Sequence, residues 1–379
     1  MLTRISAARR LAIGTALAVL LAATGVERRA SAQSSQTSDF PCDIRTTERV
    51  VAIGDVHGAF DNFVSILRAA QLIDGRNRWT GGRTVLVQTG DILDRGADSR
   101  RAVDLLRRME RDAARAGGRV VSLLGNHELM RIIADWRYVS TGELEAFKNR
   151  DSEQFREQVF TTLSEQAAQR AKAEGRVHDA AAYREQFLRE VPLGFIEMRQ
   201  AFGPEGEYGK WVRERATVAR VNGVVFLHGG ITPETAALGC VGINAAVRRD
   251  IASLPLPPEQ LVSLMSVSET GPLWYRGLAN EPEAALSSVL PAILEQMQAR
   301  AIVIGHTPVL PGRIATRVGG RVIQIDSGML DGTFFPGGVP SALELRGDAV
   351  TAIYLDRREP LSPLPAPAAS TPTAAPASR

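Results

Sequence analysis

Five short motifs rich in histidine, aspartate and glycine are spread along the chain, each at the end of a predicted strand. They lie at residues 54–58, 90–96, 125–128, 228–230 and 305–308. Four of the five histidines of the chain belong to them. Histidine, carboxylate and amide side chains form a ligand set for two divalent metal ions held close together. Such a pair hydrolyses phosphate esters by stabilising both the attacking and the leaving oxygen, so the motifs point to this chemistry.

Alternating strands and helices are expected to position the first three motifs. Short runs rich in β-branched residues at 49–53, 84–87 and 119–124 each end at a motif, and a helical pattern follows the first run at 60–70. Successive strand–helix units are joined by right-handed crossovers, which makes their strands parallel. The functional loops of such strands lie at the same edge of the sheet, so we expect these three motifs to meet there.

The second half of the chain favours antiparallel strands. The runs 217–221 and 224–227 flank an Asn-Gly turn and predict a hairpin. The run 301–304 predicts a strand that ends at the last motif, and two more hairpins are expected around 319–320 and 347–348. The expected fold class is therefore α/β, with α+β character in the second half. Two sheets would pack face to face as a β-sandwich flanked by helices.

Six segments are expected along the chain. They are a signal peptide at 1–32, a flexible lead at 33–47, the first half of the main domain at 48–135, a helical insertion at 136–215, the second half of the main domain at 216–358 and a disordered tail at 359–379. The insertion is charged and has no β-branched run of any length. The tail consists largely of proline, alanine, serine and threonine, which cannot bury a core.

The first 32 residues have the features of an export signal. A basic start precedes an apolar stretch at 11–23 that is too short to span a membrane, and Ala30-Ser31-Ala32 offers a cleavage site. Cleavage there would begin the mature chain at Gln33 and deliver it to the periplasm or the medium by the general or the twin-arginine route. A retained anchor is the weaker alternative because the apolar stretch is short.

The net charge of +3 comes largely from this leader, which carries five arginines and one glutamate. The remaining chain is close to neutral and gives no electrostatic reason to expect nucleic-acid partners or a membrane surface. No later run is long and apolar enough for a membrane span. Cys42 and Cys240 are the two cysteines. A single disulfide and two separate buried thiols are equally compatible with the sequence.

Together the five motifs resemble those of the calcineurin-like metallophosphoesterase superfamily, and within it the phosphoprotein phosphatases. The resemblance runs in chain order from Arg49 to about Gly328. The short motif at 305–307, the helical insertion and the sequence Gly-Pro-Leu-Trp-Tyr-Arg at 271–276 make the chain most similar to the Shewanella-like protein phosphatases. This resemblance implies hydrolysis of phosphate monoesters on proteins or peptides, at phosphotyrosine, phosphoserine or phosphothreonine.

The resemblance also implies a binding site for two divalent metal ions, with manganese, iron and zinc as candidates. The ligands would be Asp55, His57, Asp91, Asn126, His228 and His306. Asp91 would bridge the two ions because a carboxylate has two oxygens. A metal-bridging hydroxide would then attack phosphorus directly. Each histidine ligand is expected to need a hydrogen-bond acceptor that fixes its tautomer.

The remaining motif residues are assigned to the reacting phosphate. His127 would protonate the leaving oxygen as the general acid, Asp94 would hold His127 in its charged form, and Arg95 would bind phosphoryl oxygens. A second phosphate-binding arginine is expected, with Arg276 as the first candidate and Arg131 as the second. We expect Glu128 to begin a helix and support the site, and Asp326 to serve in a turn or behind the ligands.

Three other functions are compatible with parts of the sequence. Hydrolysis of dinucleoside polyphosphates is compatible with the motif at 305–307, although those nucleotides are mainly cytoplasmic and the leader predicts export. A broad-specificity phosphatase acting on small phosphoesters is the second alternative. A metal-binding module without activity is the third, and the complete set of expected ligands argues against it. The sequence leaves the metal, the substrate and the oligomeric state open.

Overall fold

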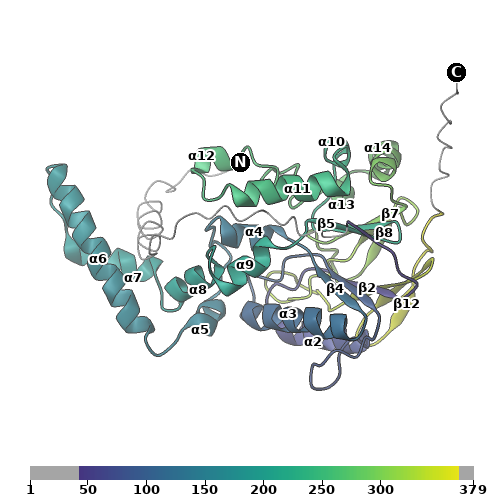
Figure 1. Cartoon of the computed structure of the whole chain (residues 1–379), viewed down its shortest axis with the longest axis horizontal. Helices are drawn as coiled ribbons and strands as arrows, with labels where there is room; N and C mark the ends of the chain where they lie inside the picture. Colours follow the sequence, from purple (N-terminus) through teal and green to yellow (C-terminus); the bar gives the residue numbers. More distant parts are fainter. Residues whose placement is uncertain (1–41, 367–379) are drawn as a thin grey trace. The chain divides into compact units, whose positions relative to one another are not determined.

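The computed structural model describes residues 42–366 (Figure 1). The predicted signal peptide at 1–32 and the predicted cleavage before Gln33 lie outside the described residues. Within them the chain divides into two compact units, of which one is Leu144–Lys210 and the other holds the remainder. Over residues 42–366, no helix combines the length and the apolar character that a membrane span requires.

One six-stranded sheet of the larger unit carries the first three motifs. Its strands, in spatial order, are β12 (Arg358–Pro360), β11 (Ala349–Ile353), β10 (Ala342–Arg346), β2 (Val50–Ile53), β3 (Val85–Gln88) and β4 (Arg119–Ser122). The strands β2, β3 and β4 are parallel, as predicted, whereas β10 and β11 are antiparallel neighbours. The loops that follow β2, β3 and β4 therefore share one edge of the sheet.

The second six-stranded sheet carries the other two motifs. Its strands, in spatial order, are β1 (Asp43–Ile44), β5 (Val218–Val221), β6 (Val224–Leu227), β7 (Ala301–Ile304), β9 (Val322–Gln324) and β8 (Ala315–Arg317). The predicted hairpins are present as β5–β6, β8–β9 and β10–β11. The strands β6, β7 and β9 are nevertheless parallel to one another, so this half is less antiparallel than expected. As a result, the motifs after β6 and β7 also share an edge.

The two sheets face each other across a common core, which confirms the predicted sandwich. Val224 and Phe226 of β6 belong to a buried cluster that also contains Val85 and Val87 of β3. The alternate β6 side chains Val225 and Leu227 belong to a second cluster on the opposite face. This alternation follows from the two-residue period of a strand.

Helices cover the outer faces of the sandwich. The helices α2 (Phe60–Ala69) and α3 (Ser99–Arg115) lie side by side on the first sheet (Figure 1). The second cluster includes residues of α11 (Gly239–Ala252) and α14 (Glu283–Gln296), which cover the second sheet. Shorter helices of this unit are α4 (Asn126–Ile132), α10 (Pro233–Ala236), α12 (Pro258–Leu261) and α13 (Gly277–Asn280).

The smaller unit is helical. It holds α6 (Ser152–Ala173), α7 (Ala180–Glu190) and α8 (Phe195–Phe202), with the adjoining parts of α5 (Thr141–Phe147) and α9 (Glu207–Arg213). A small cluster around Phe187 and Leu163 forms its core. These helices fall inside the predicted insertion at 136–215, but the compact unit is shorter than predicted.

Hydrogen bonds within the larger unit explain the shorter insertion. The carbonyl of Tyr138 accepts the Arg95 N–H at 2.8 Å, and the Ser140 hydroxyl donates to the Gly96 carbonyl at 2.9 Å. At the other end, the Trp211 indole donates to Glu110 at 3.1 Å. Residues on both sides of the insertion are therefore fixed to the main domain.

Two predictions about the chain ends are wrong for the residues that the structure describes. Within the predicted flexible lead, β1 pairs with β5 and a disulfide joins Cys42 to Cys240, with their Cα atoms 5.9 Å apart. Within the predicted disordered tail, β12 pairs with β11 and Leu364 is buried against the core. Both segments are held by distant strands, which local composition does not reveal.

Candidate active site

The carboxyl ends of strands from both sheets bring the five motifs together. The six predicted metal ligands and the predicted general acid are each at most 5% exposed: Asp55, His57, Asp91, Asn126, His127, His228 and His306. Asp55 and His57 follow β2, and Asp91 follows β3. His228 and His306 follow β6 and β7 of the other sheet. The site therefore lies where the two sheets meet.

The backbone of these loops takes conformations that L-amino acids rarely adopt. Five motif residues have positive φ angles: His57 at 48°, Asp91 at 55°, Asp94 at 70°, Arg95 at 68° and His306 at 66°. Residues held in such sparsely populated conformations cluster at functional sites. Gly90 shows how tightly the loops pack, because a Cβ there would lie 2.4 Å from the Gly125 nitrogen.

The first cluster of donor atoms centres on His57. Its Nδ1 contacts the Leu93 carbonyl at 3.0 Å, which fixes the tautomer and leaves a lone pair on Nε2. This Nε2 lies 3.6 Å from Asp91 Oδ2 and 3.8 Å from Asp55 Oδ2. Burial lowers the pKa of His57 to about 3, so the imidazole is neutral at physiological pH. A neutral imidazole is the form that binds metal.

The second cluster centres on His228. Its Nδ1 contacts the Thr89 carbonyl at 3.0 Å, so its Nε2 carries a lone pair. That Nε2 lies 2.8 Å from Asn126 Oδ1 and 3.1 Å from His306 Nδ1. The other His306 nitrogen contacts the Trp274 carbonyl at 3.2 Å, so the expected acceptors are present for all three histidines predicted as ligands.

The donor atoms of both clusters fit a pair of metal ions. The lone pairs of His228 Nε2, His306 Nδ1 and Asn126 Oδ1 converge without a proton between them, an arrangement that a cation stabilises. Burial is the largest effect on His306 and lowers its pKa to about 2. Two groups could hold an ion, His57–Asp91–His127 and Asp91–His228–His306, and Asp91 belongs to both.

The predicted general acid lies beside the shared carboxylate. His127 Nε2 is 3.8 Å from Asp91 Oδ2, and His127 Nδ1 is 2.7 Å from Asp94 Oδ2. Burial alone would lower the pKa of His127. The carboxylates of Asp91 and Asp94 outweigh that effect, and the pKa lies above its usual value. His127 is therefore suited to keep a proton near neutral pH.

Comparison with known proteins connects this geometry to a family. The sequence model of the calcineurin-like phosphoesterases matches residues 48–310. The chain belongs to this family. Members of the family typically depend on two metal ions, and the enzyme is a hydrolase that acts on phosphoesters.

Relatives of this phosphoesterase confirm the resemblance to the Shewanella-like protein phosphatases. It is 32% identical over 337 residues to Shewanella-like protein phosphatase 2 of Arabidopsis thaliana. The aligned region covers 83% of this chain and 80% of the relative. The chain is 26% identical to Shewanella-like protein phosphatase 1 of Plasmodium berghei, over 83% of this chain and 76% of the relative. The cold-active protein-tyrosine phosphatase of a psychrophilic Shewanella species matches with a TM-score of 0.62 and 27% identity, over 85% and 82% of the two chains.

Two of the three arginines considered for phosphate lie in the site of the phosphoesterase. Arg95 Nη1 is in close contact with His57 Nε2. Arg276 donates to the His306 carbonyl at 2.7 Å and to Thr307 Oγ1 at 3.0 Å. The prediction of phosphate binding for Arg131 is wrong. Its fully buried side chain lies behind Asp94, at 2.5 Å from Oδ1, on the side away from His127.

Glu128 supports the site as expected. It lies in α4, and its carboxylate accepts the N–H groups of Asp91 and Ile92 at 2.8 Å and of Gly125 at 2.9 Å. Asp326 also lies behind the ligands. One of its oxygens accepts the Gly328 N–H at 3.0 Å, and burial raises the pKa of its carboxyl to about 6.

Several residues near the site of the phosphoesterase were not predicted from sequence. The rings of Tyr138 and Phe335 lie 5.1 and 5.6 Å from those of His127 and His57. Glu143 contacts Arg131 at 3.0 Å. Aromatic rings outside the motifs carry no spacing signal. Glu143 has no motif of its own, and only its pairing with Arg131 connects it to the site.

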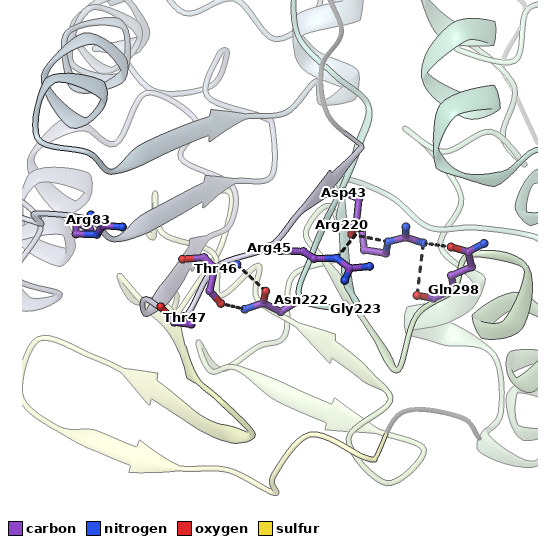
Figure 2. A pocket seen from close by; sticks show the side chains of 9 residues that line it. All are labelled: Asp43, Arg45, Thr46, Thr47, Arg83, Arg220, Asn222, Gly223 and Gln298. Carbon is purple, nitrogen blue, oxygen red and sulfur yellow. Dashed lines mark hydrogen bonds and ion pairs between the residues drawn. The ribbon is translucent and has the colours of Figure 1, made fainter. Parts of the chain in front are cut away.

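A hollow of about 770 Å³ lies at the opposite ends of the strands (Figure 2). Its lining consists of Asp43, Arg45, Thr46, Thr47, Arg83, Arg220, Asn222, Gly223 and Gln298. Arg83 precedes β3 and Gly223 precedes β6, whereas the motifs follow these strands. Arg220 is paired with Asp43 at 3.0 Å. This hollow is therefore separate from the metal-binding clusters of the phosphoesterase.

Proposed function

We propose that the enzyme is an exported protein phosphatase that prefers phosphotyrosine and uses two divalent metal ions with His127 as the general acid. The observation that carries the proposal is the position of the His127–Asp94 pair. It borders Asp91, the carboxylate that both metal-binding groups share. A proton donor next to a two-metal site is what cleavage of a phosphate monoester requires.

The six ligands would hold the two ions. His57, Asp55 and Asp91 would bind one, and Asn126, His228, His306 and the same Asp91 would bind the other. When bound, the ions would activate water near neutral pH and neutralise the charge that develops on the phosphoryl oxygens. The carbonyls of Leu93, Thr89 and Trp274 would keep each imidazole oriented toward its ion.

His127 would protonate the leaving oxygen. Because Nδ1 is bonded to Asp94, Nε2 is the nitrogen that faces the metal-binding clusters and carries the transferable proton. Arg95 and Arg276 would bind the phosphoryl oxygens, and a planar guanidinium can give each of them two directed hydrogen bonds.

Aromatic side chains around Arg95 favour phosphotyrosine as the substrate. The Arg95 guanidinium lies 5.2 Å from the ring centres of Tyr138 and Phe335 and 6.0 Å from that of Phe334. Tyr138 is 39% exposed and Phe334 is 52% exposed, so both are accessible to a substrate. The phenyl ring of phosphotyrosine could pack against them, whereas phosphoserine and phosphothreonine have no ring.

The disulfide supports export, because disulfides persist in oxidising compartments and are rare in the cytosol. Together with the predicted leader, it favours the periplasm or the medium. Manganese is the metal used in the test, since its preference for oxygen ligands suits the carboxylate and amide oxygens of this site.

The test measures phosphate release by manganese-loaded protein that begins at Gln33. Phosphotyrosine and phosphothreonine peptides of the same sequence are compared, with diadenosine tetraphosphate alongside. We expect the phosphotyrosine peptide to be preferred, and Phe334→Ala to reduce that preference. Leu355→Ala is the matched control because Leu355 is also 52% exposed. Hydrolysis of the nucleotide alone, or no turnover with metal bound, would refute the proposal.

A further inference from the structure

Arg131 is a buried cation that none of the roles above uses. Its side chain is 0% exposed, and its Nη2 lies 2.5 Å from Asp94 Oδ1 and 3.0 Å from Glu143 Oε1. Burying a guanidinium is costly unless carboxylates pair with it. Because this burial is costly, we ask what the arginine does for Asp94, the residue it lies behind.

Helix geometry joins Arg131 to the general acid. His127 and Arg131 are four residues apart on α4 and therefore lie on the same face of the helix. His127 Nδ1 contacts Asp94 Oδ2 at 2.7 Å, and Arg131 contacts Oδ1 at 2.5 Å. Each oxygen of Asp94 thus has its own partner from one helix, so the carboxylate cannot rotate without breaking a charged hydrogen bond.

Glu143 closes the arrangement from the other side. Its Oε1 accepts from Arg131 and also from the Asp94 N–H at 3.3 Å, and its Oε2 accepts the Ser140 N–H at 3.1 Å. Asp94 has a φ of 70°, a conformation that needs support from its surroundings. Glu143 is 1% exposed, so this contact is shielded from water. The side chain and the backbone of Asp94 are therefore fixed by the same buried pair.

We propose that Arg131 and Glu143 are positioning residues that fix Asp94, so that His127 presents its proton to the leaving oxygen. This inference rests on the proposed role of His127. In that step a water oxygen forms a bond to phosphorus, the bond from phosphorus to the leaving oxygen breaks, and the electron pair of the broken bond stays on the leaving oxygen. The proton moves from His127 Nε2 to that oxygen, and the imidazole becomes neutral.

Two substrates that differ in the leaving group separate this role from a structural one. Phenyl phosphate releases a basic phenolate, which needs a proton as it leaves. p-Nitrophenyl phosphate releases a much more acidic phenol, whose anion leaves without protonation. A defect in positioning the acid should slow only the first reaction, whereas damage to the metal site or the fold should slow both.

The variants are Arg131→Met, Arg131→Lys and the double variant Arg131→Met/Glu143→Gln. The double variant removes both buried charges, so it provides a second test if Arg131→Met does not fold. Arg111→Met and Glu145→Gln are matched controls, because Arg111 is exposed on α3 and the Glu145 side chain on α5 is 59% exposed. Manganese content and circular dichroism are measured for every protein.

We expect Arg131→Met to lower kcat for phenyl phosphate by ~10–100-fold and kcat for p-nitrophenyl phosphate by less than about threefold. KM and manganese content should stay at the wild-type level, and Arg131→Lys should recover part of the lost rate. The double variant should show the same selective loss.

Equal losses on both substrates in folded, manganese-loaded protein would overturn the inference and leave Arg131 a purely structural residue. Wild-type rates on both substrates would overturn it as well. If the wild type itself hydrolyses neither substrate with manganese bound, the proposed function fails first, and the two failures are thereby distinguished.

Discussion

Individual side chains in the site are held by main-chain carbonyls as much as by one another. The carbonyls of Leu93, Thr89 and Trp274 each contact one ring nitrogen of a histidine. The other nitrogen of each ring faces the donor atoms of the two clusters. The residues that gather at the site could be predicted from sequence, because each sits in a short motif. These orienting carbonyls could not, because every residue has one and only the fold decides which faces a histidine.

Arg131 shows the limit of prediction at the residue level. Its place four residues after His127 indicates that it lies near the site. The direction of its guanidinium depends on Glu143, which comes from another helix. The sequence therefore predicted proximity correctly and the binding partner incorrectly.

His127→Asn should lower kcat for phosphotyrosine peptide by ~10²–10⁴-fold, the usual range for loss of a general acid. Manganese content, measured by elemental analysis, should remain near the wild-type level. Asp91→Asn provides the contrast and should lower manganese content, because Asp91 is shared by both metal-binding groups. Full activity in His127→Asn would rule out its assigned role.

Among the elements, a buried apolar run or a turn signal between strands decides what could be predicted. The four-residue strands β2, β3, β6 and β7 are fully buried and rich in β-branched or other apolar residues, so their sequences revealed them. The strands β1 and β12 have only two and three residues. Elements that short have no periodic pattern and exist because a longer strand offers a free edge.

Glu344 of β10 connects distant elements of the first sheet. Its carboxylate accepts from Arg49, next to β2, at 2.9 Å and from Arg346 at 3.1 Å. Burial acts to raise the pKa of Glu344, but these arginines outweigh it, and the pKa falls below its usual value. A carboxyl with a lowered pKa in the folded state stabilises the fold above its unfolded-state pKa. That stabilisation disappears as the pH falls through the folded-state pKa.

Glu344→Gln should therefore lower the free energy of unfolding by about 1–3 kcal/mol at pH 7, from the loss of charged hydrogen bonds. The difference from the wild type should shrink as the pH falls below about 4.5, where the unfolded-state carboxyl takes up a proton. Urea unfolding of metal-free protein at several pH values measures it. Glu359→Gln is the control, because the Glu359 side chain is 53% exposed. A difference that stays constant with pH would contradict this account.

For the whole molecule, the sandwich and the order of the motifs were predictable, whereas the boundaries of the helical insertion were not. Composition changes near residue 136, but the compact helical unit begins at Leu144. The residues between them bond to the loop after β3. Side-chain composition indicates whether a segment is exposed and whether it favours a helix. It does not indicate which unit a connecting segment contacts.

The disulfide should stabilise the larger unit without affecting catalysis. It closes a span of 198 residues between the start of β1 and α11, and neither cysteine is among the predicted site residues. The double variant Cys42→Ser/Cys240→Ser should lose ~2–5 kcal/mol of stability while its kcat stays near the wild-type value. Thermal unfolding with and without reductant measures the effect, and reduced wild type should match the variant. An unchanged Tm would show that the bond contributes nothing.

The strand order also governs when the predicted metal site can form. β2 pairs with β10, and β5 pairs with β1, so each sheet combines strands from opposite ends of the chain. A chain that emerges amino end first exposes Asp55 and His57 long before His306 or β10 exists. The centre therefore closes only after nearly all of the chain is available, as long-range pairing requires. Since metal availability often decides which ion a site of this kind binds, we expect the metals present where the last strands pair to decide which ion this site would hold.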